Sequence, residues 1–147
     1  TIAGAGDDAL LRDLIKLTQE NGLESYINFV GFIDGDEKHV LYRESDILLL
    51  PSENENFGVA VAESIGHQVP VIVSDSVALQ SFVKTHNTGI VITELNVRVL
   101  VDAILSLKSN YQKFWNECVN SKHLLHWQLV FDAWLAEFNT KRNSPSI

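Results

Sequence analysis

Hydrophobic and polar positions follow two different periods along this chain. Short apolar runs predict strands, whereas apolar positions three and four residues apart predict helices. The expected strands cover residues 2–4, 26–31, 46–50, 70–74 and 89–92. The expected helices cover about 8–21, 36–44, 58–66, 80–84, 97–107, 111–122 and 124–138. Strands that alternate with helices predict an α/β domain with a doubly wound parallel sheet and C-terminal helices.

The run at 46–50 is the most continuous of the expected strands. Asp46 is followed by Ile47 and three leucines, a pattern typical of a strand buried on both faces of a parallel sheet. Ligands of such sheets bind outside the carboxyl ends of the strands. The residues after Leu50 and after Ala3 are therefore the first candidates for a binding site.

Composition narrows the class of ligand. The chain has 147 residues, 11 Lys and Arg against 19 Asp and Glu, and a net charge of −8. This balance argues against a nucleic-acid partner, because phosphate neutralisation needs clustered cations. It leaves a nucleotide ligand open, since backbone N–H groups at a helix N-terminus can hold a diphosphate. The single cysteine, Cys118, is expected to be a buried small apolar residue. The five histidines show no ligand spacing, so we expect no metal site.

A polar turn follows the expected strand at 46–50. It runs from Pro51 to Gly58 and leads into a helix. The first N–H groups of a helix have no intrahelical partner, and the helix dipole adds positive potential there. Gly58 lets a ligand approach the backbone closely, because it has no side chain. The turn therefore predicts an anion site suited to a phosphate.

Two carboxylates flank this expected anion site. Glu55 lies just before the helix, and Glu63 lies about one and a half turns inside it. Carboxylates only accept hydrogen bonds, and sugar hydroxyls are good donors. We expect one carboxylate to hold a hexose and the other a ribose, with a diphosphate between them. Taken singly, each glutamate could instead be a carboxylate favoured by the helix dipole.

The same stretch resembles the E-x7-E block of retaining GT-B glycosyltransferases, the group 1 or family-4-like enzymes. The matching positions are Pro51-Ser52, Glu55, Phe57-Gly58, Glu63, Pro70-Val71-Ile72 and Ser74. The resemblance extends back to Ile2-Ala3-Gly4-x-Gly6, Gly31, Lys38 and Ser45-Asp46, and forward to Gly89 and Trp127. It implies a Rossmann-like fold, the C-terminal nucleotide-sugar-binding half of a GT-B architecture. We expect this donor domain over 1–142, truncated before its first strand, and a disordered tail over 143–147.

The resemblance also implies roles for individual residues. Glu55 would bind hydroxyls of the donor sugar and take part in catalysis, and Glu63 would bind the ribose hydroxyls. The remaining donor-binding candidates are the backbone of Asn56, Phe57, Gly58 and Val59, the base-flanking Ile33 and Lys38, and Gly4 and Gly6 near the phosphates. For Phe57 we expect the side chain to pack and only the backbone to meet the ligand. No cofactor or metal is implied beyond the nucleotide-diphosphate sugar itself.

The chain departs from the family pattern near the end of the motif helix. Ser64 replaces the usual alanine, a benign change, and Gln68 replaces a glycine that usually ends the helix in a left-handed conformation. Gln68 either adopts that conformation at some cost, or Gly66 moves the helix end earlier.

A second departure concerns catalysis. Family members carry an upstream loop with an Arg and a Lys that neutralise the leaving diphosphate, and an N-terminal acceptor domain; neither appears in this sequence. Because charge stabilisation is commonly a dominant catalytic contribution, we expect the parent protein to be a hexosyltransferase-type enzyme and this piece alone to be inactive. We expect a cytoplasmic location, with peripheral association at the inner face of a membrane as an open alternative. A non-catalytic module that binds a nucleotide or a partner is the competing function.

Overall fold

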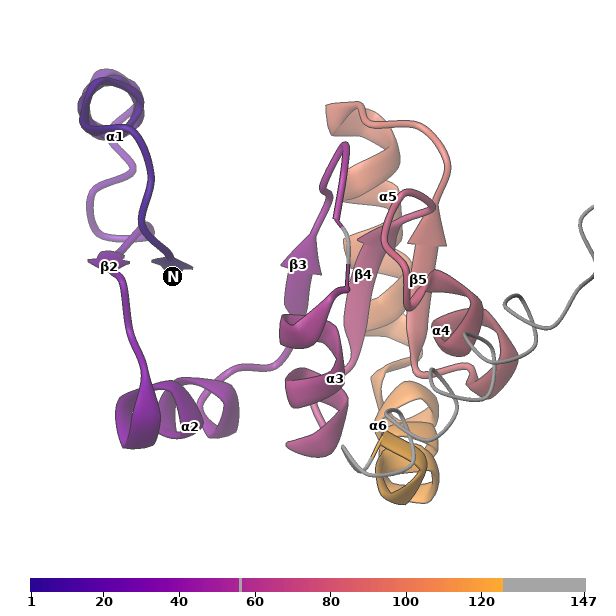
Figure 1. Cartoon of the computed structure of the whole chain (residues 1–147). Helices are drawn as coiled ribbons and strands as arrows, with labels where there is room; N and C mark the ends of the chain where they lie inside the picture. The colour runs from indigo at the N-terminus through magenta and orange to yellow at the C-terminus, as the bar shows by residue number, and fades with distance from the viewer. Residues whose placement is uncertain (56, 126–147) are drawn as a thin grey trace, which may run out of the picture. The chain divides into compact units, whose positions relative to one another are not determined.

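The computed structural model describes residues 1–55 and 57–125 of the chain (Figure 1). The chain forms two compact units, Thr1–Leu41 and Tyr42–Ile147. The expected helix at 124–138, with Trp127, and the expected tail lie almost wholly outside the described residues.

The first unit contains a pair of parallel strands and a long helix. Strands β1 (Ile2–Ala3) and β2 (Phe29–Gly31) pair in parallel, and helix α1 (Asp8–Glu20) connects them. The helix begins where the pattern predicts, because Asp7 caps it: its Oδ1 accepts bonds from the amides of Ala9 at 2.6 Å and Leu10 at 3.2 Å. The expected strand at 26–31 is too long at its start, since residues 24–26 form a turn. Helix α2 (Gly35–Arg43) follows.

The second unit contains a three-stranded parallel sheet. Strands β3 (Leu48–Leu50), β4 (Val71–Ser74) and β5 (Gly89–Ile92) lie in the order β3-β4-β5, with Leu48 opposite Val71 and Val71 opposite Gly89. The helices are α3 (Val59–Gly66), α4 (Gln80–His86), α5 (Val97–Ser109) and α6 (Tyr111–Ser121), and a 3₁₀ turn covers Lys122–Leu125. Helix α4 ends at His86, two residues beyond the predicted end at Lys84.

Helices cover both faces of this sheet, as Figure 1 shows. Successive side chains of a strand point to opposite faces. Val71 and Val73 of β4 accordingly join a cluster with Val77 of the following loop and with residues of α3, α4 and α6 (Val61, Ile65, Val83 and Cys118). Ile72 joins a second cluster with Ile92 and with Ala103 and Leu107 of α5. The doubly wound arrangement predicted from the sequence is therefore present in the second unit.

The buried strand of the sheet is β4 rather than β3, so one expectation from the sequence is wrong. All four β4 residues are buried, whereas Leu49 in the middle of β3 is 42% exposed. Within the described residues β3 pairs only with β4 and forms the edge of its sheet. An apolar run alone does not distinguish an edge strand from a central one.

Cys118 has the environment expected for it. Its side chain is fully buried, and its thiol donates to the backbone oxygen of Thr88 at 3.4 Å. Burial, with a smaller contribution from the charge of Glu117, raises the pKa of the Cys118 thiol to about 12. The residue is thus an unreactive member of the core.

Candidate functional site

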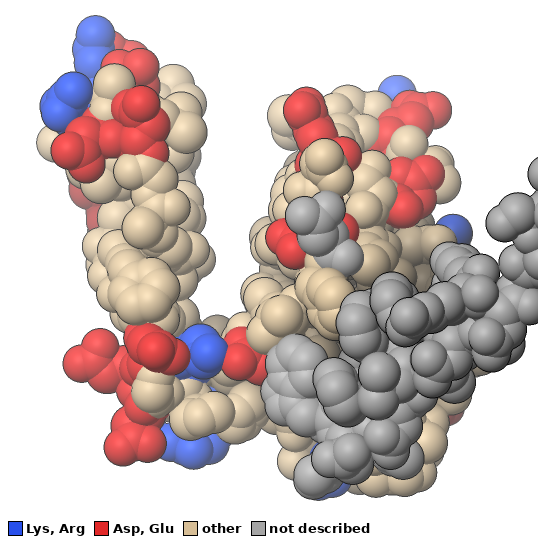
Figure 2. Space-filling view, in the orientation of Figure 1, with Lys and Arg blue, Asp and Glu red and all other residues tan. Residues whose placement is uncertain are grey.

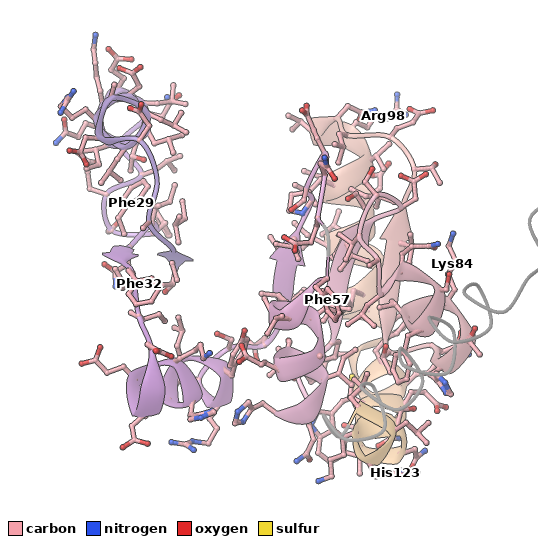
Figure 3. All side chains as sticks on the ribbon, in the orientation of Figure 1. Phe29, Phe32, Phe57, Lys84, Arg98 and His123 are labelled. Carbon is pink, nitrogen blue, oxygen red and sulfur yellow. The ribbon has the colours of Figure 1, made fainter. Side chains whose placement is uncertain are left out.

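The polar turn after β3 is fastened to the segment that follows β4. The Ser74 hydroxyl donates a short hydrogen bond to the backbone oxygen of Ser52. Further along the turn, Glu55 forms an isolated parallel bridge with Val77. These two contacts fix the turn at the carboxyl ends of neighbouring parallel strands, where α/β sheets bind ligands. Figure 3 labels Phe57 in this turn, beside the beginning of α3.

Gly58 occupies a position that only glycine fills well. It is the N-cap of α3 and has left-handed angles, φ 65° and ψ 40°. A Cβ added there would lie 3.0 Å from Cγ1 of Val77. Both the angles and the close approach disfavour a side chain. The sequence predicted an open backbone for a ligand; the structure adds that Gly58 also lets the turn pack against Val77.

The Glu55 carboxylate lies on the amides at the start of the helix. Its Oε1 accepts bonds from the N–H of Phe57 at 3.3 Å and of Gly58 at 3.2 Å. These are two of the amides that the sequence analysis assigned to the ligand. Two N–H groups of the turn thus point to a negative group, which here is the side chain of Glu55 itself.

Glu63 is held by a residue that the sequence analysis missed. It lies partly exposed in α3, and its Oε2 is 3.1 Å from the hydroxyl of Tyr42 at the end of α2. The same hydroxyl is 3.3 Å from the backbone oxygen of Ala60. Tyr42 precedes Glu63 by 21 positions, and no periodicity links two residues so far apart. Only its place shortly before the apolar run of β3 could have drawn attention to it.

The end of α3 combines the two alternatives proposed for it. The helix ends at Gly66, with His67 as its C-cap, and Gln68 is nevertheless left-handed with φ 66°. The amide of His67 donates to the oxygen of Glu63 at 2.9 Å, and that of Gln68 to Ile65 at 2.9 Å. Gln68 thus takes the conformation that a glycine usually takes at a helix end. Ser64 is buried, and its hydroxyl donates to the backbone oxygen of Val69 at 3.0 Å.

Three further residues of this turn were predicted to belong to the site: Asn56, Phe57 and Val59. Asn56 lies outside the described residues. The side chain of Phe57 was expected to pack, but it is 48% exposed in the structure. Val59, the first residue of α3, is also exposed. The backbone of the turn, rather than its apolar side chains, is what the fold fixes in place.

The remaining candidates belong to the first unit. Gly4 has a positive φ of 138°, and its amide donates to the oxygen of Gly31 at 2.8 Å. Gly6 has no atom within 4 Å of an added Cβ. Ile33 is partly buried, and the Lys38 amine lies 3.7 Å from the carboxylate of Asp34. These four residues lie in Thr1–Leu41, whereas Glu55, Gly58 and Glu63 lie in Tyr42–Ile147.

The first unit contains one sequence pattern that occurs in metal sites. Asp34-Gly35-Asp36 is an Asp-x-Asp triplet, a pattern that can hold a divalent cation. Here Asp34 forms an ion pair with Lys38, and Asp36 lies in the first turn of α2. Across residues 1–55 and 57–125 no group of three His, Cys, Asp or Glu residues is placed to hold a metal ion.

The charge of the surface sets how an anion can be held. The view in Figure 2 shows acidic side chains on both units and fewer Lys and Arg, in keeping with the net charge of −8. At the turn, the groups that could attract an anion are therefore backbone N–H groups and the dipole of α3.

The α/β fold with parallel strands is the Rossmann-like fold found in GT-B glycosyltransferases. Residues 1–122 match the family model described as glycosyl transferases group 1. The chain belongs to this family.

Similar proteins agree with this membership. An uncharacterised glycosyltransferase of Methanocaldococcus jannaschii is 33% identical over 109 residues, which are 71% of this chain and 27% of that protein. Sucrose-phosphate synthase of Thermosynechococcus elongatus has a TM-score of 0.77 at 24% identity, over 97% of this chain and 38% of its own. The Anabaena protein HepE, solved in complex with UDP-glucose, has a TM-score of 0.77 at 19% identity, over 95% of this chain and 40% of its own. The chain thus spans well under half the length of these proteins.

None of the helices in the described part of the chain is long and apolar enough to cross a bilayer.

Proposed function

We propose that this chain forms the C-terminal donor-binding half of a retaining glycosyltransferase. It would bind a nucleotide-diphosphate sugar at the turn between β3 and α3. The observation that supports this most directly is the geometry of α3: a left-handed glycine at its N-cap, one glutamate before it and a second glutamate within it. The complex of HepE with UDP-glucose supports the class of ligand.

Each part of the donor has a chemically suitable partner in this proposal. The diphosphate meets the N-terminal amides of α3, Glu55 accepts hydroxyls of the sugar, and Glu63 accepts hydroxyls of the ribose. The amides of Phe57 and Gly58 now donate to Glu55. We expect those bonds to lengthen or break when the oxygen atoms of the donor arrive.

Transfer with retention breaks the bond between the anomeric carbon and the phosphate oxygen. The nucleoside diphosphate leaves with the electron pair, an acceptor hydroxyl bonds to the same face of the sugar, and its proton passes to the departing phosphate oxygen. Glu55 acts here by orienting the sugar, and the dipole of α3 favours the charge that develops on the leaving group. No metal or other cofactor has a role in this proposal. We place the protein in the cytoplasm.

Binding is tested by calorimetric titration of the full-length protein with UDP-, GDP- and ADP-glucose. We expect one donor to bind with an affinity in the range of about 1 μM to 1 mM, typical of enzyme substrates. Glu55→Ala and Glu63→Ala should each weaken it by about tenfold or more, since each removes hydrogen bonds to a charged acceptor. Glu53→Ala, an exposed carboxylate of the same turn, is the matched control and should have little effect.

A transferase assay distinguishes this function from the competing one, a non-catalytic module. If the full-length protein transfers sugar and both glutamate variants keep the wild-type rate, the enzymatic assignment of this site fails. If no donor binds at millimolar concentration, donor binding itself is refuted.

A further inference from the structure

Tyr42 contacts one of the two motif glutamates, Glu63, from outside helix α3. Its hydroxyl lies 3.1 Å from Oε2 of Glu63 and 3.3 Å from the backbone oxygen of Ala60. A phenol has one proton, so it donates to one of these oxygens at a time. The ionised carboxylate is the stronger acceptor of the two. The bond to Glu63 is therefore the one expected to dominate.

The ring of Tyr42 is fixed as well as its hydroxyl. It stacks on His67 with a centroid distance of 5.4 Å and an interplanar angle of 12°. His67 caps the same helix that carries Glu63, one turn further on. Tyr42 thus contacts α3 at two levels, through its hydroxyl and through its ring, which restricts where the hydroxyl can be.

The Tyr42 hydroxyl stays protonated and so remains a hydrogen-bond donor. Burial, and then the charge of Glu63 and the hydrogen bond to it, raise the pKa of the Tyr42 hydroxyl well above its usual range. The hydroxyl therefore keeps its proton throughout the physiological range. It can therefore act as a donor to Oε2 of Glu63 throughout that range.

We propose that Tyr42 is a positioning residue that orients the Glu63 carboxylate for the ribose of the donor. A carboxylate has about four acceptor sites, and Tyr42 uses one of them on Oε2. Holding one oxygen in place reduces the rotamers that Glu63 must give up when two neighbouring ribose hydroxyls bind. The inference rests on the proposed function, and it assigns Tyr42 a share in the recognition of ribose.

The test uses the full-length protein and pairs of ligands that differ only in the ribose. Of UDP, GDP and ADP, the nucleotide that binds most tightly is compared with its 2′,3′-dideoxy form by calorimetry. Tyr42→Phe keeps the ring on His67 and removes only the hydroxyl. We expect it to weaken the ribonucleotide by about five- to tenfold and the dideoxy form by less than twofold. In the transferase assay KM should rise by a similar factor with kcat nearly unchanged.

The control is Tyr111→Phe, which removes the hydroxyl of another partly buried tyrosine in the same unit. It should leave both ligands unaffected. Thermal unfolding of each variant establishes that it is folded.

Three outcomes would overturn the inference, and they are distinguishable. A wild-type protein that binds no nucleotide refutes the proposed function and the inference with it. A wild type that binds both ribose forms equally refutes the ribose contact of Glu63. A Tyr42→Phe variant that is unchanged, or that weakens both forms alike, refutes the role of Tyr42 and leaves donor binding intact.

Discussion

At the scale of single residues, the site depends on a backbone conformation as much as on its carboxylates. Gly58 has φ 65° and lies so close to Val77 that an added Cβ would be 3.0 Å from Cγ1. The amide of Gly58 also donates to Glu55. A change at this one position therefore disturbs the packing of the turn, the start of α3 and the orientation of Glu55 together.

Gly58→Ala should destabilise the protein and weaken the donor. A left-handed non-glycine residue costs about 1–2 kcal/mol, and the contact with Val77 adds to it, so we expect a loss of about 1–3 kcal/mol in the free energy of unfolding. Denaturant unfolding measures the loss, and calorimetry should show donor affinity falling with it. Gly66→Ala is the control.

Gly66 ends the same helix, has open space around an added Cβ and shows no positive φ. Alanine there should be neutral or stabilising by up to about 1 kcal/mol, because alanine has the higher helix propensity. Equal losses in the two variants would show that the left-handed conformation of Gly58 is unimportant.

The residues of the site differ in how far the sequence could predict them. Glu55, Gly58 and Glu63 stand in one continuous stretch, so their spacing alone places them around one helix end. Tyr42 escaped prediction because its contact with Glu63, 21 positions later, arises only when the second unit folds. The exposure of Phe57 was likewise missed, since an apolar residue next to a helix start is equally compatible with packing and with exposure.

At the scale of elements, the starts of helices were predicted correctly where a capping side chain determines them. The cap at Asp7 starts α1, and Asn96 caps α5 through a bond from the Val99 amide at 2.9 Å. The prediction failed for β3, because its burial depends on how many neighbouring strands it has, which its own residues do not encode. Starts and ends of helices are thus more predictable here than the place of a strand in its sheet.

The C-terminal end of α3 offers a stability test of this local chemistry. Gln68 is left-handed at φ 66° directly after the C-cap His67. Gln68→Gly should raise the free energy of unfolding by about 0.5–1 kcal/mol, because the relief of steric cost exceeds the extra entropy of glycine in the unfolded chain. Thermal and denaturant unfolding measure it.

Gln68→Ala provides the matched variant, since it removes the same side chain and keeps the left-handed strain. We expect it to be no more stable than the wild type. If alanine stabilised the protein as much as glycine does, the gain would come from loss of the glutamine side chain and not from the backbone. Donor affinity should stay the same in both variants, since neither touches the N-terminal end of α3.

At the scale of the whole molecule, the buried apolar clusters of the described residues lie in the second unit. Both core clusters are built from residues between Val61 and Cys118. In the first unit Thr18 is the buried residue of α1, and the apolar positions of that helix are exposed (Leu10, Leu11, Leu14, Ile15 and Leu17). Regions with few buried apolar groups open at low free energy. We therefore expect the first unit to open at a lower free energy than the second.

Native-state hydrogen exchange of the chain tests this difference. The amides of β4 and β5 should exchange most slowly, through openings close to global unfolding of their unit, and those of β1 and β2 at least about tenfold faster.

Ile72→Ala removes a fully buried side chain of β4 and should lower the free energy of unfolding of that unit by about 2–5 kcal/mol. We expect it to accelerate exchange in β4 and β5 alone. Ile2→Ala, in a strand whose isoleucine is 46% exposed, is the paired control and should affect β1 and β2 alone. If Ile72→Ala accelerated all four strands equally, the units would unfold as one cooperative body, and the concentration of stability in the second unit would be disproved.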